Sequence, residues 1–438
     1  MDALVVGAGI SGLAAARRLR REGWSVRVLE AGDVAGGCLA TIRQDGFTAE
    51  LGANTVQESE ALLELCRDAG CADELIPASD RAARRYLVHA GRLEPLPGHP
   101  GDLLRSPVLG FGAKLRLLME PFIPRGPGGD ETLATFFRRR LGRAAAESLG
   151  DAMVLGVYAG DPAELVAGHA FPRLHRFEQE HGSLIRGALA TRRSGVRRRR
   201  LLGYRHGFAA LAEALTHGLD VRFGEAVTSI SPGPAGFEVE AGRSSHGARR
   251  LVLALPQQPA RELLTRLDPE TGLPDPLPAA PVAVVALGYS RRDVAHPLDG
   301  FGFLAPHREG RNVLGCLFPS TLFDGRAPEG SVLLIAMLGG RRRPEIADLP
   351  EGELYATAEA ELAELLGIKG SPVFRAHRRW RPGIPQPTAA RKALLRAVDE
   401  LERRHPGLEV LGNWCRGVGI PDCAAAGWGG FGGRGGAS

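Results

Sequence analysis

Hydrophobic positions at the start of the chain predict two strands with a helix between them. Residues 3–6 form a short, continuous apolar run, which is typical of a buried strand. Apolar residues then recur at positions 10, 13, 14, 16 and 19, a spacing that places them on one face of a helix. A second apolar run follows at residues 26–29. The first thirty residues therefore predict a strand–helix–strand unit.

A glycine-rich turn joins the first predicted strand to the helix. The turn has the pattern GxGxxG and consists of Gly7, Ala8, Gly9, Ile10, Ser11 and Gly12. In this pattern the first glycine allows a tight turn, the second lets a pyrophosphate approach the backbone, and the third lets the helix pack against the strand. Glu30 closes the second strand, where a carboxylate can accept both hydroxyls of a ribose. These features predict a dinucleotide-binding unit rather than a chance glycine turn.

The pattern along the rest of the chain predicts an α/β protein with two further lobes. Strands of an antiparallel sheet are predicted at residues 282–289, 301–306, 313–318 and 332–339. Helices are predicted at residues 207–215, 351–366 and 389–404, and over most of residues 130–190 with an interruption at 156–162. Strands at residues 251–256 and 408–411 return the chain to the first sheet.

These elements group into segments that cross between lobes. We predict that residues 1–80, 201–275 and 406–423 build the nucleotide-binding lobe. Residues 81–200 then form a helical lobe and residues 276–405 mostly a substrate-binding sheet. Residues 424–438 are a glycine-rich tail. A chain of 438 residues exceeds one compact core, so several lobes are expected.

Composition and charge argue against a membrane-spanning protein, a metal-binding protein and a nucleic-acid-binding protein. The 44% hydrophobic and 24% charged content is ordinary for a globular protein, and no apolar run approaches the roughly 20 residues of a membrane span. The six cysteines show neither a CxxC pair nor zinc spacing, so we predict no metal site and a reduced, cytoplasmic setting. The net charge is +5, and the arginine-rich run at residues 192–200 lacks interleaved aromatic residues. We interpret that run as a solvated loop and predict no nucleic-acid partner.

Residues 111–123 combine apolar and basic side chains between proline- and glycine-rich stretches. Such a segment is typical of peripheral contact with a membrane, here the inner face of the cell membrane. Packing beneath the substrate lobe is the alternative interpretation.

A second glycine pair narrows the choice of dinucleotide. Gly36 and Gly37 follow Glu30 by a few residues, and the turn at residues 52–55 comes soon after. NAD enzymes do not need this extension. It resembles the flavoprotein pattern of amine oxidases, phytoene desaturases and protoporphyrinogen oxidases, although an ordinary loop is the alternative.

Four separate stretches resemble one family in order along the chain. They are GVYAGDP at residues 156–162, FGFLAP at 301–306, RW with GIPQ at 379–386, and GN with GVGIPDC at 412–423. Together they resemble the oxygen-dependent, FAD-containing protoporphyrinogen and coproporphyrinogen III oxidases of the flavin amine oxidase superfamily. The resemblance implies an α/β fold with a FAD-binding Rossmann-like domain, an antiparallel substrate domain and a helical domain.

The resemblance also assigns roles to individual residues. Besides the GxGxxG turn and Glu30, the residues implied to line FAD are Gly36, Gly37, Cys38, Gly52, Ala53, Asn54, Thr55, Val227, Val418, Gly419, Asp422 and Cys423. Arg85 would pair with a substrate propionate, a task that suits a guanidinium. Gly156 would let the macrocycle pass close to the backbone, and the residues implied to sandwich its pyrrole rings are Phe301, Leu304, Leu317 and Met337. From the sequence alone, these last four would be ordinary core residues.

The predicted reaction is oxidation of protoporphyrinogen IX to protoporphyrin IX, with O₂ as acceptor and H₂O₂ as by-product. No general base stands out in the sequence, and pyrrole nitrogens lose protons readily, so none is assigned as catalytic. The resemblance adds hand-over of product to a ferrochelatase and a homodimer to the predicted partners.

Three alternatives stay open at this point. Coproporphyrinogen III is a second substrate candidate, although Arg85 as the one cation assigned to the pocket favours protoporphyrinogen. An amine or carotenoid oxidoreductase could use the same scaffold. A non-catalytic flavin- or tetrapyrrole-binding protein is the alternative of another class.

That last alternative rests on the C-terminal tail. Relatives are expected to carry a helix whose N-terminus faces the flavin, whereas residues 424–438 contain seven glycines. Each interior glycine costs about 1 kcal/mol of helix stability relative to alanine. We therefore expect no stable closing helix and weaker retention of FAD.

Overall fold

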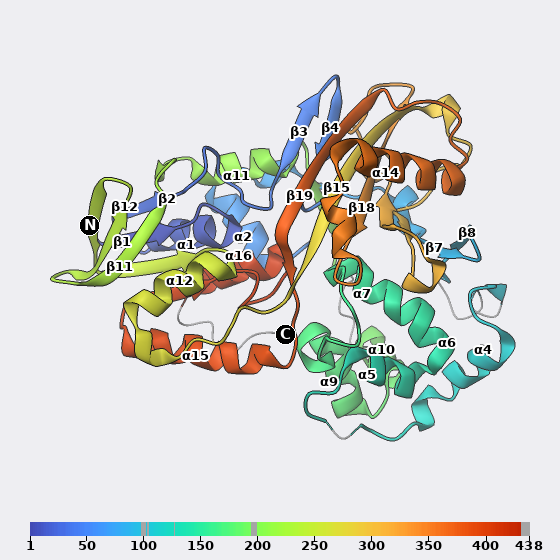
Figure 1. Ribbon diagram of the computed structural model, residues 1–438, viewed down its shortest axis with the longest axis horizontal. Coiled ribbons are helices and arrows are strands. Elements are labelled where there is room, and N and C mark those ends of the chain that lie inside the picture. Colours follow the sequence, from blue (N-terminus) through green and yellow to red (C-terminus); the bar gives the residue numbers. More distant parts are fainter. Residues whose placement is uncertain (98–101, 103–104, 127, 194–198, 431–438) are drawn as a thin grey trace.

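The protein consists of a parallel-sheet lobe, a second sheet and a group of helices (Figure 1). The computed structural model describes residues 1–97, 102, 105–126, 128–193 and 199–430. Most of the arginine-rich run at 192–200 and the last eight residues of the tail therefore lie outside the described residues.

A five-stranded parallel sheet forms the centre of the first lobe. Its strands, in spatial order, are β10 (Asp220–Arg222), β2 (Val26–Leu29), β1 (Ala3–Val6), β14 (Arg250–Ala254) and β20 (Leu408–Leu411). In β1 every residue is buried, and alternate side chains enter the two hydrophobic clusters on opposite faces of the sheet. The apolar run at residues 3–6 is continuous because both faces of this strand are covered, so that every side chain is buried.

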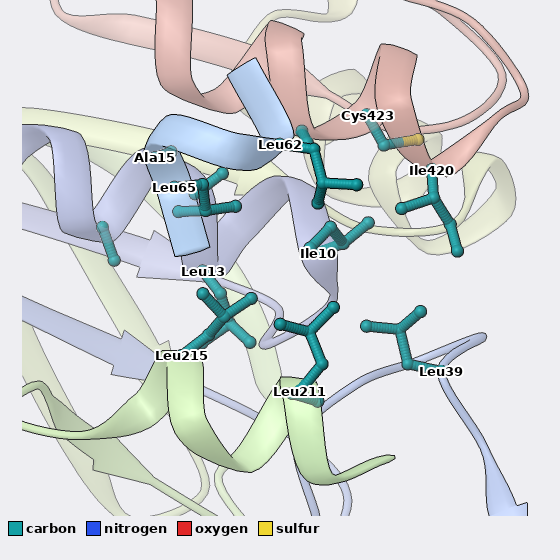
Figure 2. Close-up of a cluster of buried hydrophobic side chains, with 14 of the residues drawn as sticks. Ile10, Leu13, Ala15, Leu39, Leu62, Leu65, Leu211, Leu215, Ile420 and Cys423 are labelled. Carbon is teal, nitrogen blue, oxygen red and sulfur yellow. The ribbon is translucent and has the colours of Figure 1, made fainter. Parts of the chain in front are cut away.

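Helices cover both faces of this sheet. On one face lie α1 (Ile10–Arg21), α2 (Glu60–Asp68), α11 (Phe208–Thr216) and α16 (Ile420–Gly429), whose apolar side chains meet in one cluster (Figure 2). On the other face lie α12 (Gln257–Leu267), α15 (Ala390–Arg404) and a small sheet of β11 (Val227–Gly233), β12 (Gly236–Ala241) and β13 (Ser244–Ala248). The predicted helices at 207–215 and 389–404 are confirmed.

Short strands connect this lobe to the second sheet. They are the hairpin of β3 (Thr41–Gln44) and β4 (Phe47–Glu50), and a three-stranded group of β5 (Val56–Gln57), β9 (Leu201–Tyr204) and β6 (Leu75–Pro77). The Phe47 ring stacks on Phe374 of the second sheet, with the ring centroids 4.8 Å apart.

The second sheet has seven strands. In spatial order they are β19 (Phe374–Pro385), β15 (Ala279–Ser290), β18 (Ser331–Gly339), β17 (Val313–Leu317), β16 (Gly302–Leu304), β7 (Tyr86–His89) and β8 (Arg92–Pro95). The four predicted strands from residue 282 to 339 are confirmed and pair antiparallel. The sheet as a whole is mixed, because β7 joins β16 in parallel. Helix α14 (Glu351–Leu366) packs on one face, and α13 (Pro319–Leu322) follows β17.

The helical group contains α4 (Phe111–Leu118), α5 (Leu133–Leu141), α6 (Arg143–Ala145), a π-helical turn (Ala146–Gly150), α7 (Asp151–Tyr158), α8 (Ala167–Ala170), α9 (Pro172–His181) and α10 (Leu184–Arg193). The predicted interruption at 156–162 is wrong at its start, because α7 continues to Tyr158 and ends at Ala159 with φ +46°. Buried Arg140 pairs with Glu120 and Glu178 between these helices. Within the described residues, no helix is long and apolar enough to span a membrane.

The expectation of a missing C-terminal helix is wrong. Helix α16 runs to Gly429 between α1 and α2. A Cβ built on Gly427 would overlap the Ser11 carbonyl oxygen and lie 2.8 Å from the Ala14 Cβ. Glycine therefore lets the two helix backbones approach, and the burial gained there offsets its low helix propensity. The Trp428 indole also donates to Glu64 of α2 over 2.8 Å.

Candidate functional site

The GxGxxG turn lies where the parallel sheet changes direction. Strands β2 and β14 flank β1 on opposite sides, so the strand order reverses beside β1, the place where open α/β sheets bind ligands. Gly7 has φ +101°, and a Cβ there would overlap the carbonyl oxygen of Ala254 at the end of β14. A Cβ on Gly12 would overlap the Gly7 carbonyl oxygen, whereas no atom of the residues that the structure describes lies within 4 Å of one on Gly9. The turn thus leaves open space at Gly9, in front of the N-terminus of α1.

The Glu30 carboxylate is fixed at the edge of this space. One oxygen accepts from the Ala8 N–H over 2.7 Å and the other from the Gly32 N–H over 2.9 Å. The returning segment also lies here, since the N–H groups of Gly224 and Glu225 donate to the carbonyls of Gly32 and Glu30. Val227 begins β11 just beyond that segment. The structure therefore brings the predicted ribose acid beside the predicted phosphate turn.

The second glycine pair adjoins the first turn. Gly36 donates its N–H to the Ala8 carbonyl over 2.8 Å and pairs with Gly9 in an isolated bridge. Gly36 and Gly37 have φ of +122° and +58°, backbone conformations that favour glycine. The extension at residues 36–37 and the GxGxxG turn at residues 7–12 thus form one continuous surface, which we term the cofactor wall.

The turn at residues 52–55 meets this wall through Cys38. The Ala53 N–H donates to the Cys38 carbonyl over 3.2 Å, and the Asn54 amide donates to Gly52. The side-chain oxygen of Asn54 is buried with no hydrogen-bond partner in the described part of the chain. An unpartnered buried acceptor indicates a place for a ligand donor.

The N-terminus of α16 completes the wall from the far end of the chain. Ile420 and Cys423 lie close to Ile10 of α1 in the cluster of Figure 2. The Asp422 carboxylate accepts the N–H of Gly419 over 3.2 Å. Burial raises the pKa of Cys423 to about 12. The Cys423 thiol is therefore neutral at physiological pH and serves as an apolar packing group.

Three of the motif stretches converge beside α16. The Gln386 amide donates to the Tyr158 carbonyl over 3.0 Å, which joins GIPQ to GVYAGDP. Val418 packs with Tyr158 and Ile384 in one hydrophobic cluster. The segments near residues 158, 385 and 418, which are far apart in the sequence, are thus in contact with one another in the folded protein.

Of the predicted substrate residues, Leu304, Leu317 and Met337 share one face of the seven-stranded sheet. A Cβ on Gly156 would lie 3.2 Å from a methyl carbon of Leu304, so these two positions touch. Leu317 and Met337 stand on adjacent strands, and both are partly exposed. Phe301 lies farther out, in a small separate cluster, with the Arg85 guanidinium carbon 5.1 Å from its ring centre. The structure brings these six positions to neighbouring strands and to α7, and their roles stay predictions.

Sequence reasoning missed a buried ion pair between the two sheets. Glu50, at the end of β4, accepts hydrogen bonds from the Thr41 hydroxyl over 2.6 Å and from the Phe208 N–H over 3.0 Å. Arg326 approaches the same carboxylate at 3.4 Å and donates to the Tyr204 carbonyl. Burial raises the pKa of Glu50 to about 7 from an ordinary value of 4.5, and its hydrogen bonds and Arg326 oppose that rise. The signal for this pair was absent from the sequence because its partners are 276 positions apart.

Replacing Glu50 with glutamine is expected to change the pH dependence of stability. A carboxyl group with a raised folded-state pKa contributes most below pH 4.5, and that contribution is lost as pH rises through about 7. Wild-type stability should therefore fall by about 3 kcal/mol relative to Glu50→Gln between pH 4.5 and 8. Denaturant unfolding of both proteins across this range measures the difference. The exposed Glu213→Gln is the control, and parallel curves for Glu50→Gln and wild type would contradict the expectation.

Comparison of the whole sequence with known protein families shows which kind of protein carries this site. The sequence profile described as flavin containing amine oxidoreductase matches residues 10–429. The chain belongs to this family. It is a flavin-dependent oxidoreductase with FAD as its cofactor. The open space at Gly9, the positive φ angles at residues 36 and 37, the fixed Glu30 and the unpartnered Asn54 oxygen all fit such a dinucleotide.

Individual relatives extend over the whole chain. The mitochondrial protoporphyrinogen oxidase of Nicotiana tabacum is 30% identical, covering 97% of this chain and 92% of its own. The coproporphyrinogen III oxidase of Bacillus subtilis (strain 168) is 26% identical, covering 96% and 95%. A crystal structure from Exiguobacterium sp. 255-15 that carries the provisional name protoporphyrinogen oxidase has a TM-score of 0.84 at 24% identity, covering 98% and 97%, and confirms the fold. The resemblance found in the sequence is thereby confirmed at the level of family.

Proposed function

We propose that this enzyme oxidises protoporphyrinogen IX to protoporphyrin IX. Six hydrogens leave the substrate and three O₂ become three H₂O₂, so atoms and electrons balance. The observation that carries the proposal is the 30% identity to the tobacco enzyme over 97% of this chain. The arrangement of Leu304, Leu317 and Met337 along one sheet face next to Gly156 supports it, because a flat macrocycle needs an apolar surface.

Bound FAD supplies the two-electron redox chemistry. The chain contributes position and charge. We propose that the apolar sheet face orients the macrocycle, that Gly156 permits close approach to α7, and that Arg85 binds a propionate. The Phe301 ring lies under the Arg85 guanidinium at 5.1 Å and limits the directions in which that guanidinium points. Pyrrole N–H groups release their protons to solvent, so no protein base is assigned.

Coproporphyrinogen III is the second candidate substrate. It carries two further propionates in place of two vinyl groups. Its support is the similarity to coproporphyrinogen III oxidases of Bacillus subtilis and Staphylococcus aureus, which are 26% and 25% identical over nearly the whole chain.

Anaerobic mixing with each porphyrinogen tests the proposal. We expect the flavin absorbance to bleach, and porphyrin fluorescence and O₂ uptake to appear after air is admitted. Bleaching by an amine but by neither porphyrinogen would indicate an amine oxidoreductase. Porphyrin binding without O₂ uptake would indicate a non-catalytic binding protein. Hand-over to a ferrochelatase and a homodimer remain predictions from the resemblance.

We also propose that the apolar surface of α4 and the turn after it rests on a membrane. Phe111 and Phe122 are 85% and 72% exposed, and Leu115 and Leu118 are exposed beside them. The basic Lys114 lies on the same short helix, so anionic lipid is the expected partner.

Replacing both Phe111 and Phe122 with serine should reduce binding to vesicles several-fold without changing turnover of a dispersed substrate. Co-sedimentation with vesicles containing one-third phosphatidylglycerol measures this binding. Val373→Ser is the control, because Val373 is 63% exposed and precedes β19, outside the helical group. Equal sedimentation of all three proteins would contradict the membrane proposal.

A further inference from the structure

Strand register places an arginine on the proposed substrate face that the sequence did not single out. Leu304 pairs with Gly315, Gly315 with Met337, Met337 with Val284, and Val284 with Arg378. Directly paired residues in neighbouring strands point to the same face of a sheet. Arg378 is therefore in one row with Leu304 and Met337, two of the apolar residues proposed to hold the macrocycle, and lies at the β19 end of that row.

The surroundings of Arg378 show that this face points toward the cofactor wall. Its guanidinium carbon lies 4.3 Å from the centre of the Trp380 ring. The Trp380 indole donates to the Leu51 carbonyl over 2.6 Å, and a Cβ on Gly52 would lie 3.2 Å from that indole. Burial raises the pKa of the Cys38 thiol, and Arg378 is close enough to Cys38 for its charge to act on that pKa in the lowering direction. Arg378 is thus held at the junction of the FAD-binding turns and the sheet.

Unlike its neighbours Arg375 and Arg379, Arg378 makes no hydrogen bond or ion pair to a described residue. Arg375 forms two hydrogen bonds of 2.7 and 3.0 Å with Glu359. Arg379, on the opposite face, donates to the carbonyls of Ala347 and Leu349. By contrast, no carboxylate of a described residue lies within ion-pair distance of Arg378, and its side chain is exposed. An exposed, stacked guanidinium without an internal partner is suited to an external carboxylate.

We propose that Arg378 is a specificity residue that binds a second carboxylate of the substrate, at the opposite end of the sheet face from Arg85. The inference rests on the proposed porphyrinogen oxidation and concerns its second candidate substrate, coproporphyrinogen III. Arg85 immediately precedes β7, which lies five strand spacings, or about 24 Å, from β19, and two long arginine side chains can reach inward over part of that distance. Two cations at opposite ends of an apolar surface match a flat substrate with carboxylates on opposite edges. Coproporphyrinogen III has this property because each of its four pyrroles carries a propionate.

Steady-state kinetics of Arg378→Gln and Arg378→Lys with both porphyrinogens test the proposal. Loss of a charged hydrogen bond should raise KM for coproporphyrinogen III roughly tenfold to a hundredfold. The KM for protoporphyrinogen IX should change less than about twofold, and kcat should change little for either substrate. The Arg378→Lys variant should have a KM for coproporphyrinogen III between those of wild type and Arg378→Gln. The matched control is Arg375→Gln on the same strand, which should leave both KM values unchanged.

Two binding measurements make the outcome independent of turnover. FAD affinity of the apo-protein, measured by flavin fluorescence, should be equal for wild type and Arg378→Gln. Affinity for the stable product coproporphyrin III, measured by porphyrin fluorescence, should fall in parallel with the kinetic effect.

Each other outcome overturns a defined part of the proposal. If the ratio of KM for coproporphyrinogen III to KM for protoporphyrinogen IX is equal in wild type and Arg378→Gln, Arg378 has no role in specificity. A loss of FAD affinity with both KM values raised together would show that Arg378 binds the cofactor phosphates. If the wild type oxidises neither porphyrinogen but binds coproporphyrin III in an Arg378-dependent way, the proposed function fails while the carboxylate site stands.

Discussion

Gly9→Ala is expected to yield a folded protein that binds FAD more weakly, whereas Gly12→Ala should destabilise the lobe itself. Within the described part of the chain, no atom lies within 4 Å of a Cβ on Gly9, and its φ of −74° is accessible to alanine. The added methyl group would instead occupy the space in which a pyrophosphate approaches the backbone. We expect FAD affinity to fall at least about tenfold, which corresponds to 1.4 kcal/mol.

The matched change at Gly12 has a different cause. A Cβ there would overlap the Gly7 carbonyl oxygen, a backbone atom that cannot move without displacing β1 from α1. We expect a loss of about 3 kcal/mol in the free energy of unfolding, at the upper end of overpacking effects. Thermal unfolding of the apo-proteins and FAD titration separate the two effects. A Gly9→Ala protein that is purified with stoichiometric flavin would contradict the assigned role of this turn.

Gly427→Ala is expected to lower the free energy of unfolding by about 1–3 kcal/mol, although alanine is the better helix former. The methyl group would overlap the Ser11 carbonyl oxygen and crowd the Ala14 side chain, and so push α16 away from α1. Because the N-terminus of α16 adjoins the residues predicted to bind FAD, FAD affinity should fall as well.

Gly429→Ala provides the control for this prediction. No atom of a described residue lies within 4 Å of a Cβ on Gly429, at the end of the same helix. Alanine there should leave stability unchanged or raise it by up to about 1 kcal/mol. Equal stabilities of the two variants would show that contact with α1 does not require glycine at 427. Since α16 is formed, the reason for expecting weak FAD retention no longer holds.

Several parts of the fold could be predicted because their causes are local. The apolar run at residues 3–6, the helical spacing from Ile10 and the acid at Glu30 each depend on neighbours within a few residues. The strands between residues 282 and 339 follow from apolar runs bounded by turns, and the structure confirms them. Motif order along the chain also identified the family correctly.

Helix propensity failed at α16 because it counts the cost of each glycine without the contact that the glycine makes. The sum over residues 424–438 predicted no helix, yet Gly427 is buried against α1, more than 400 positions earlier in the chain. Tertiary packing overrode local preference there.

The sequence by itself determined the strand–turn–helix unit, the order of the elements and the family, since periodicity and motif spacing are written along the chain. The tertiary structure alone decided that Glu50 meets Arg326, that α16 closes against α1, and that Arg378 shares a row with Met337. Each of these depends on strand register or helix contact between distant segments. A one-residue slip in register would turn Arg378 to the opposite face, and no local pattern in the sequence specifies that register.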